Sequence, residues 1–196
     1  MQTNENFSLT LNNNTSIEMI WVAPGTFQMG SPGDQLKFVR TGGFLKNLFK
    51  SGPEVIKKGE LGRDFFERRT ETVEIEDGFW LSKYPLTNEQ WNAFLPEYGK
   101  TGDASTRNKP IEATWEQAAR YFEQLNAQGL ASEGYFFDFP HEAQWEYACR
   151  AGTTTALNNG HDLTSLKRCP HLDELAWYDK NSRGMNAVGQ KAPNAW

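Results

Sequence analysis

Histidine and cysteine would carry the most specific chemistry in this chain, and both are scarce. The chain has 3 His and 2 Cys. His161, Cys169 and His171 fall within one short stretch, and a Cys and a His two residues apart can contribute to a zinc site. A structural zinc site needs four such ligands at recognisable spacing, and the sequence has no CxxC or HxxxH motif. We therefore expect these three residues to be weak metal-ligand candidates in a solvated loop.

The other cysteine, Cys149, would need a base and an orienting group to act as a nucleophile. We expect it on the buried face of a helix beside Trp145, where a cysteine usually behaves as an inert small hydrophobe. Glu142 and Glu146 lie one turn apart on this helix, and we expect them to cap it or to face solvent. The sequence has no GxSxG motif and no phosphate-binding loop. Residue types and spacing alone do not define a catalytic centre.

Length and composition are typical of one globular domain. The chain has 196 residues, of which 38% are hydrophobic, 23% charged and 13% aromatic. Such a chain can bury a core without disulfide support, and its many rings indicate an aromatic core beneath long loops. No apolar run approaches the about 20 residues of a membrane span, and no signal-peptide pattern begins the chain. A cytoplasmic protein is the default expectation.

Charge is distributed unevenly along the sequence. The net charge is −5, which argues against general nucleic-acid binding. Residues 34–69 hold nine Lys/Arg and five Asp/Glu, a net of +4, so the rest carries −9. We describe residues 33–69 as a basic insertion.

The basic insertion has two interpretations, which the sequence leaves open. Its apolar residues 44, 45, 48 and 49 share one helical face, so it could form a helix that docks on an acidic partner or lies on a membrane surface. Seven residues are few for an isolated helix, and a surface loop pinned by its own apolar side chains is the alternative. The candidate docking residues are Phe44, Lys46, Lys50, Lys57 and Lys58.

Short strands and three helices are predicted around this insertion. Strands are expected at 7–11, 18–22 and 26–30, with Pro24-Gly25 as a hairpin turn, and a further strand is expected at 70–76. Residues 79–81 either follow a hairpin turn at Asp77-Gly78 or continue the preceding strand after a bulge. A short strand is also expected at 175–178.

Two of the three helices begin with capping boxes. Thr87 with Gln90 and Thr114 with Gln117 have the required spacing. The second helix has its predicted apolar face on Trp115, Ala118, Ala119, Phe122 and Leu125, with Gly129 just past its end. The third helix spans 140–152, and Gly152 suits its C-terminal cap.

Five segments in chain order resemble blocks of the formylglycine-generating enzyme (sulfatase-modifying factor) family. They are residues 19–31, 73–91, 110–118, 140–152 and 188–196. The resemblance implies an α+β fold related to C-type lectins over residues 1–196. This fold has a small twisted antiparallel sheet, two or three helices and much irregular loop. Family members include copper-dependent oxidases that convert a sulfatase cysteine to formylglycine, iron-dependent sulfoxide synthases and non-catalytic binding proteins, so membership does not settle activity.

The chain departs from the family pattern at its metal sites. In catalytic members the copper-binding cysteine pair lies beyond the block that ends here at Trp196, and no cysteine pair of this chain maps onto it. Where the oxidases bind calcium, Leu175-Ala176 offers no side-chain oxygen, and Asp179 and Asn181 are too few as ligands. The resemblance therefore implies neither copper nor calcium in this chain.

Three hypotheses for function follow from these departures. The first is a non-catalytic binding or scaffold protein, completed by a partner protein or by self-association. The alternative is a metal-dependent oxidase, or a related non-haem iron enzyme, of which this chain is a truncated part. The third is a fragment whose function belongs to a longer parent domain.

Overall fold

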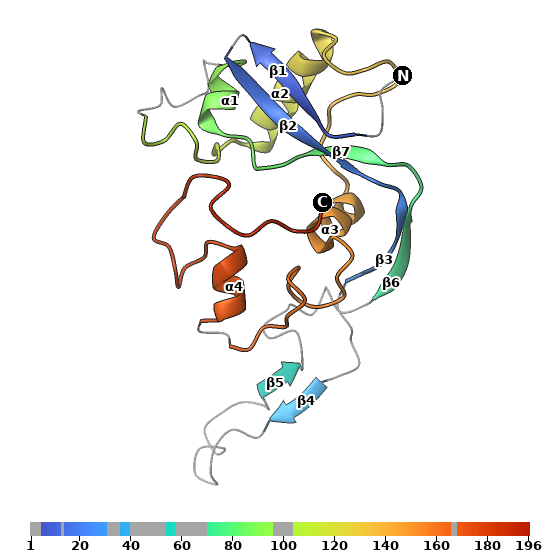
Figure 1. The fold of residues 1–196 in the computed structure, drawn as a ribbon, viewed down its shortest axis with the longest axis vertical. Coiled ribbons are helices and arrows are strands. Elements are labelled where there is room, and N and C mark those ends of the chain that lie inside the picture. The colour runs from blue at the N-terminus through green and yellow to red at the C-terminus, as the bar shows by residue number, and fades with distance from the viewer. Residues whose placement is uncertain are drawn as a thin grey trace.

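The computed structural model describes residues 5–12, 14–30, 36–39, 54–57, 70–95, 104–165 and 168–196 (Figure 1). These residues form an α+β fold of short antiparallel strands, as predicted, with four helices where two or three were expected. No helix among them is long and apolar enough to cross a membrane. The strands are β1 (Phe7–Asn12), β2 (Thr15–Val22), β3 (Gly25–Met29), β4 (Leu36–Val39), β5 (Glu54–Lys57), β6 (Glu71–Ile75) and β7 (Phe79–Ser82). The helices are α1 (Asn88–Asn92), α2 (Trp115–Ala127), α3 (Glu142–Arg150) and α4 (Pro170–Leu175).

The central feature is a long bent ribbon of two antiparallel chain segments, residues 15–29 and 71–82. One half of this ribbon contains β2 and β7, and the other half contains β3 and β6. β2 pairs with β1 on one side and β7 on the other, while β3 pairs with β6. Val22 pairs with Phe79, and Gly25 pairs with Ile75. Residues 23–24 on one segment therefore lie opposite residues 76–78 on the other. This is the bulged continuation that the sequence allowed for residues 79–81. The predicted hairpin at Pro24-Gly25 is wrong, because β2 and β3 pair with different strands and proline only bends the chain there.

The core of the described residues consists of three clusters. Val22 and Ile75 pack against Tyr147 and Ala148, so α3 lies against the β3–β6 half. Beneath the β1–β2 half, the side chains of Leu9, Ile17 and Met19 form a second cluster. The third cluster joins α1 to α2 and has at its centre Trp91, whose ring stacks on Tyr121 at 5.1 Å. Aromatic rings therefore fill much of the core, as the composition predicts.

Local capping signals in the sequence are confirmed. Thr87 and Thr114 each accept a hydrogen bond from the backbone of the glutamine three residues on, and each glutamine side chain accepts one in return. Gly129, just past α2, adopts φ +64°. The strand predicted at 175–178 is wrong, because Leu175 ends the helix α4, which begins with Pro170 at a position where its missing N–H costs nothing.

The predicted apolar face of α2 is wrong at its first residue, and that of α3 is wrong at Trp145 and Cys149. Trp115 is 68% exposed and Trp145 58% exposed, and Cys149 is also exposed. The buried side chains of α3 are Tyr147 and Ala148, which lie on the side that meets the ribbon. Trp115 is the first residue of α2 and projects past the packed turns, where its ring stacks on Phe139 at 5.4 Å.

The basic insertion is described only at β4 and β5, which pair antiparallel. Lys57 lies at the end of β5, with its backbone opposite Leu36. Phe44, Lys46, Lys50 and Lys58, and the predicted helix at 44–50, lie outside the described residues.

Candidate functional site

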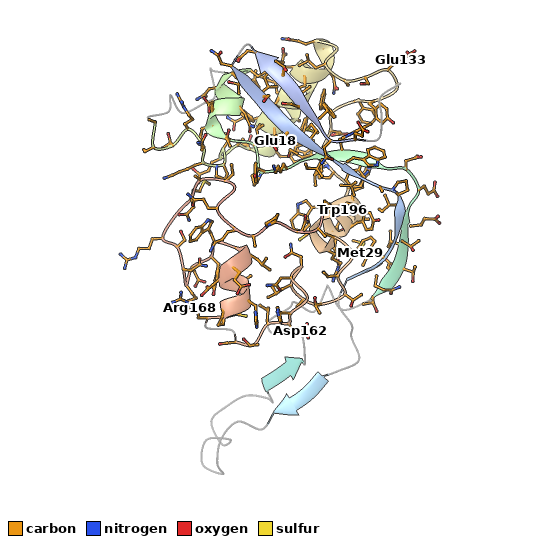
Figure 2. The ribbon with its side chains drawn as sticks, viewed as in Figure 1. Glu18, Met29, Glu133, Asp162, Arg168 and Trp196 are labelled. Carbon is orange, nitrogen blue, oxygen red and sulfur yellow. The ribbon has the colours of Figure 1, made fainter. Side chains whose placement is uncertain are left out.

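A cavity of about 490 Å³ lies between the β3–β6 half of the ribbon and the end of α3. Figure 2 shows its surroundings, with Met29 at the end of β3 and Trp196 beside α3. The lining residues come from β3, β6, α3 with its following turn, and the last two residues. They are Thr26, Phe27, Gln28, Thr72, Tyr147, Arg150, Ala151, Gly152, Thr153, Thr154, Ala195 and Trp196.

An ion pair on α3 fixes the strand wall of this cavity. Glu146 and Arg150 lie one helical turn apart, and an Arg150 nitrogen approaches the Glu146 carboxylate at 2.7 Å. Glu146 also accepts from the backbone N–H of Gly30 at 2.9 Å, and Arg150 donates to the Gly30 carbonyl at 2.7 Å. The end of β3 is thereby bound to α3 through both backbone groups of one residue. The expectation that Glu146 caps its helix or faces solvent is wrong, because its carboxylate lies between β3 and Arg150.

The turn after α3 forms the second wall. Ala151 adopts a left-handed conformation with φ 46°, and Gly152 follows with φ 82°. Two successive left-handed residues reverse the chain sharply, a conformation that glycine tolerates and alanine adopts at some cost. The Thr153 hydroxyl and backbone N–H both donate to the Arg150 carbonyl, which closes the helix end. Thr153 and Thr154 are thereby placed at the cavity.

Aromatic rings close the remaining side. Phe27 and Tyr147 lie with their ring centres 5.3 Å apart, and Tyr147 and Trp196 lie 5.7 Å apart. The Asn194 side chain holds the end of the chain in place by donating to the Ala148 carbonyl at 2.7 Å. Trp196 lines the cavity and stays 38% exposed.

The lining suits a neutral polar ligand that also has a flat apolar face. Hydroxyl groups come from Thr26, Thr72 and Thr154, and the Gln28 amide donates to the Thr72 hydroxyl at 2.6 Å. The charge of Arg150 is compensated by Glu146, so an ionic ligand gains little there. Hydroxyls and an amide provide hydrogen bonds of fixed direction, while the rings provide stacking area.

The predicted zinc candidates are close together but poorly arranged for a metal. The rings of His161 and His171 stack face to face, 3.7 Å apart and within 9° of parallel. A ring nitrogen binds zinc along its lone pair, in the ring plane, at about 2.0–2.1 Å. Parallel stacked rings therefore direct their lone pairs side by side instead of toward one point. Among the described residues, no group of three or more His, Cys, Asp and Glu could hold a metal ion.

Cys169 lies at the start of α4 and is 1% exposed. The Thr164 hydroxyl donates to its sulfur at 3.5 Å, and the Cys169 backbone N–H donates to the Tyr178 hydroxyl. The hydrogen bonds from Thr164, together with backbone N–H groups of Leu172 and His171, lower the pKa of the thiol. The sulfur is therefore enclosed by its own loop. Among the described residues, it forms no metal-binding group with the two stacked histidine rings.

The two predicted oxygen ligands are engaged within the fold. Asn181 accepts from the Tyr178 backbone N–H at 2.8 Å and donates to the Ala176 carbonyl at 2.9 Å. Asp179 pairs with its neighbour Lys180. Asn181 therefore holds its loop in place. The Asp179 side chain is 73% exposed.

Asp173 on α4 organises this region, and the sequence analysis missed it. Its carboxylate accepts from the Tyr178 hydroxyl at 2.7 Å, from Arg168 at 2.7 Å and from Asn181 at 3.2 Å. These donors hold the pKa of Asp173 below its usual value, with the Tyr178 hydrogen bond as the largest cause. A proline followed three residues later by an aspartate is the only local signal of such a helix start.

A second, more open cavity of about 580 Å³ lies beside this network. Its lining includes Trp177, Arg183 and Ser182. The Lys191 ammonium lies 3.7 Å from the centre of the Trp177 ring and donates to the Asp173 carbonyl, so that ring already has a cation partner. The cavity beside β3 is therefore the better candidate for a ligand site.

The fold and the ordered blocks define a family, and the chain belongs to it. The family profile of the sulfatase-modifying factor enzyme 1-like domain matches residues 6–196. A similar solved structure is that of PvdO from Pseudomonas aeruginosa, with a TM-score of 0.63 and 18% sequence identity. That similarity covers 100% of this chain and 69% of the PvdO chain, and at this identity it establishes the fold alone. No curated protein matches the chain significantly.

Proposed function

We propose that this chain is a non-catalytic binding or scaffold member of the sulfatase-modifying factor family, whose ligand occupies the cavity between β3 and α3. The observation that carries the proposal is the construction of that cavity. The Glu146–Arg150 pair, the left-handed turn after α3 and the Asn194 anchor each fix one wall independently. A site held rigid before its ligand arrives loses little entropy on binding.

The chemistry of the lining supports binding. Threonine hydroxyls and the Gln28 amide form hydrogen bonds without moving protons near neutral pH, and Tyr147 and Trp196 provide ring faces. A fitting ligand is neutral, joins an aromatic or flat apolar group to amides or hydroxyls, and fills about 490 Å³. A side chain and its flanking peptide bonds on a partner protein meet this description.

N-acetyltyrosine amide, which joins one ring to two neutral amides, is a suitable probe. In titrations followed by backbone NMR, we expect it to shift the amide signals of Gln28, Thr153 and Thr154 at millimolar concentration. Trp196→Ala should weaken binding by about tenfold, which corresponds to one lost stacking contact. Phe136→Ala is the matched control, because Phe136 is 73% exposed and does not line the cavity. Equal weakening by both substitutions, or no shift at about 10 mM, would overturn the proposal.

The oxidase alternative has a distinct outcome. If the purified protein retained stoichiometric copper or iron, lost it in Cys169→Ser and oxidised a sulfatase cysteine peptide, the chain would be an enzyme. A metal content that is negligible and unchanged by Cys169→Ser would support binding as the function of this chain.

A further inference from the structure

Trp115 at the start of α2 stacks on Phe139, three residues before Glu142 begins α3, so exposed rings and carboxylates occur near both helix starts. We call this surface the acidic aromatic face and define it by Trp115, Glu116, Asp138, Glu142 and Trp145, all of which are exposed. Trp115 and Trp145 are among the most exposed large hydrophobic side chains of the described residues, at 68% and 58%. Exposed apolar surface rimmed by polar residues often marks an interaction site.

Ring stacking and a hydrogen bond hold two of these residues, Trp115 and Asp138, in place. The Trp115 ring stacks on Phe139 at 5.4 Å, and Phe139 meets the partly buried Phe122 edge-on at 4.8 Å. Asp138 accepts from the Phe139 backbone N–H at 2.7 Å. On α3, Glu142 and Trp145 are three residues apart and therefore lie on the same side of the helix. Because Trp115 and Asp138 are held before contact, their part in docking costs little ordering entropy.

The charge of the surrounding sequence determines what kind of partner fits. Residues 111–150 contain seven Asp/Glu and two Arg, a net of −5, and Arg150 pairs with Glu146. The first turn of α2 lowers the pKa of Glu116 through its own backbone N–H and the Thr114 hydroxyl, so this carboxylate stays ionised. Ring faces flanked by carboxylates attract lysine and arginine, by cation–π contact and by charge. The face therefore fits a cationic polypeptide segment.

The same chain contains a segment of the opposite charge. Residues 34–69 have a net charge of +4, from nine Lys/Arg and five Asp/Glu. The described strands of that segment, β4 and β5, lie at the end of the molecule away from α2 (Figure 1). This separation favours contact with a second molecule over contact within one chain.

We propose that the acidic aromatic face binds the basic insertion of a second copy of this chain. If the face of each copy binds the insertion of the other, the two contacts are equivalent and form a closed two-fold dimer. This inference is independent of the ligand in the β3–α3 cavity. It predicts a dimer that weakens as salt is added, since the attraction is between exposed charges.

Charge reversal on each side tests the exchange by analytical ultracentrifugation. We expect Lys46→Glu with Lys50→Glu, or Glu116→Lys with Glu142→Lys, to raise the dimer dissociation constant at least about tenfold. Mixing the two double variants should restore a dimer. The altered face of one variant then meets the altered insertion of the other, and the unaltered face meets the unaltered insertion. Glu74→Lys with Glu76→Lys is the control, since it changes net charge equally at exposed positions outside the face.

Three results would overturn the proposal. The first is a wild-type chain that remains monomeric at about 100 µM in low salt. The second is a mixture of the two double variants that forms no dimer although both retain the wild-type circular dichroism spectrum. The third is a monomer in which Glu116→Lys with Glu142→Lys shifts the NMR signals of residues 34–69, which would place the insertion on its own face.

Discussion

Arg150 and Glu146 hold the two backbone groups of Gly30 between them. Arg150 donates to the Gly30 carbonyl at 2.7 Å while Glu146 accepts from the Gly30 N–H at 2.9 Å. The two side chains also pair with each other across one turn of α3. This arrangement connects the end of β3 to the helix that carries Tyr147, and so determines the width of the cavity between them.

Glu146→Gln is expected to lower the free energy of unfolding by about 2 kcal/mol. The Arg150 side chain is only 10% exposed and would keep its charge without the compensating carboxylate. Urea unfolding measures this loss as a lower midpoint at unchanged slope. Glu18→Gln serves as the control because its pair with Lys83 is exposed, and we expect its midpoint to stay close to wild type. A Glu146→Gln midpoint equal to that of Glu18→Gln would contradict this role.

Gly25→Ala is expected to destabilise the protein by about 1–3 kcal/mol through overpacking. An added Cβ would lie 2.5 Å from the Tyr147 hydroxyl oxygen. In a Tyr147→Phe background the nearest ring carbon would be 3.4 Å away, so less than half of the loss should remain. Thermal unfolding of the four variants of this double-mutant cycle measures the coupling.

Gly184→Ala is the matched control for that cycle, because nothing lies within 4 Å of its added Cβ. It should be neutral in both backgrounds. Equal costs of Gly25→Ala with and without the Tyr147 hydroxyl would show that the close approach to Tyr147 is not the reason for glycine at this position.

Local signals in the sequence predicted local structure well. The capping boxes at Thr87 and Thr114 act over three residues, so the sequence contains all that they require. The alternation at 70–76 predicted β6 for the same reason. The hairpin at Pro24-Gly25 failed because a bend and a reversal have the same turn residues, and only the pairing of β2 with β7 distinguishes them.

The candidate site was much less predictable, because its contacts join residues far apart in the chain. Glu146 reaches Gly30 across 116 positions, and Asn194 reaches Ala148 across 46. His161 and His171 were expected near each other, but ring stacking depends on side-chain orientation, which spacing does not determine. Trp145 was assigned to the core because helical periodicity gives relative faces only, and the position of the ribbon decides which face is buried.

Stability should decline as the pH falls below about 4, with Asp173 as a main contributor. Hydrogen bonds from Tyr178 and Arg168 hold its pKa below the ordinary value of 3.8. A carboxylate of this kind stabilises the fold above its unfolded-state pKa, and that contribution is lost as the pH falls through the lower folded-state pKa. Urea midpoints at about pH 7 and pH 3 measure the decline.

Asp173→Asn should lower the midpoint at neutral pH and flatten its dependence on pH in the acid range. Asp179→Asn removes a carboxylate whose side chain is 73% exposed, so we expect that variant to keep the wild-type acid profile. If Asp173→Asn kept the full wild-type decline, carboxylates elsewhere would be responsible for it.

The two cysteines should differ sharply in reactivity toward a thiol reagent such as DTNB. Cys149 is exposed, whereas Cys169 is 1% exposed, although hydrogen bonds from Thr164 lower the pKa of its thiol. A lowered pKa increases the thiolate fraction, but a buried sulfur reacts only when its loop opens, so access decides the rate. In the native protein we expect one fast thiol and a second that reacts at least about 100-fold more slowly.

Cys149→Ser should remove the fast phase, and Cys169→Ser should remove the slow phase, which becomes fast in denaturing urea. Thr164→Val should speed the slow phase if the substitution loosens the loop. If the hydroxyl acts only on the thiolate, the substitution should slow that phase, because losing the hydrogen bond raises the pKa of the Cys169 thiol. A fast phase that survives Cys149→Ser would mean that Cys169 is accessible to solvent. Its thiolate would then be available to a metal or an oxidant, and the oxidase alternative would regain support.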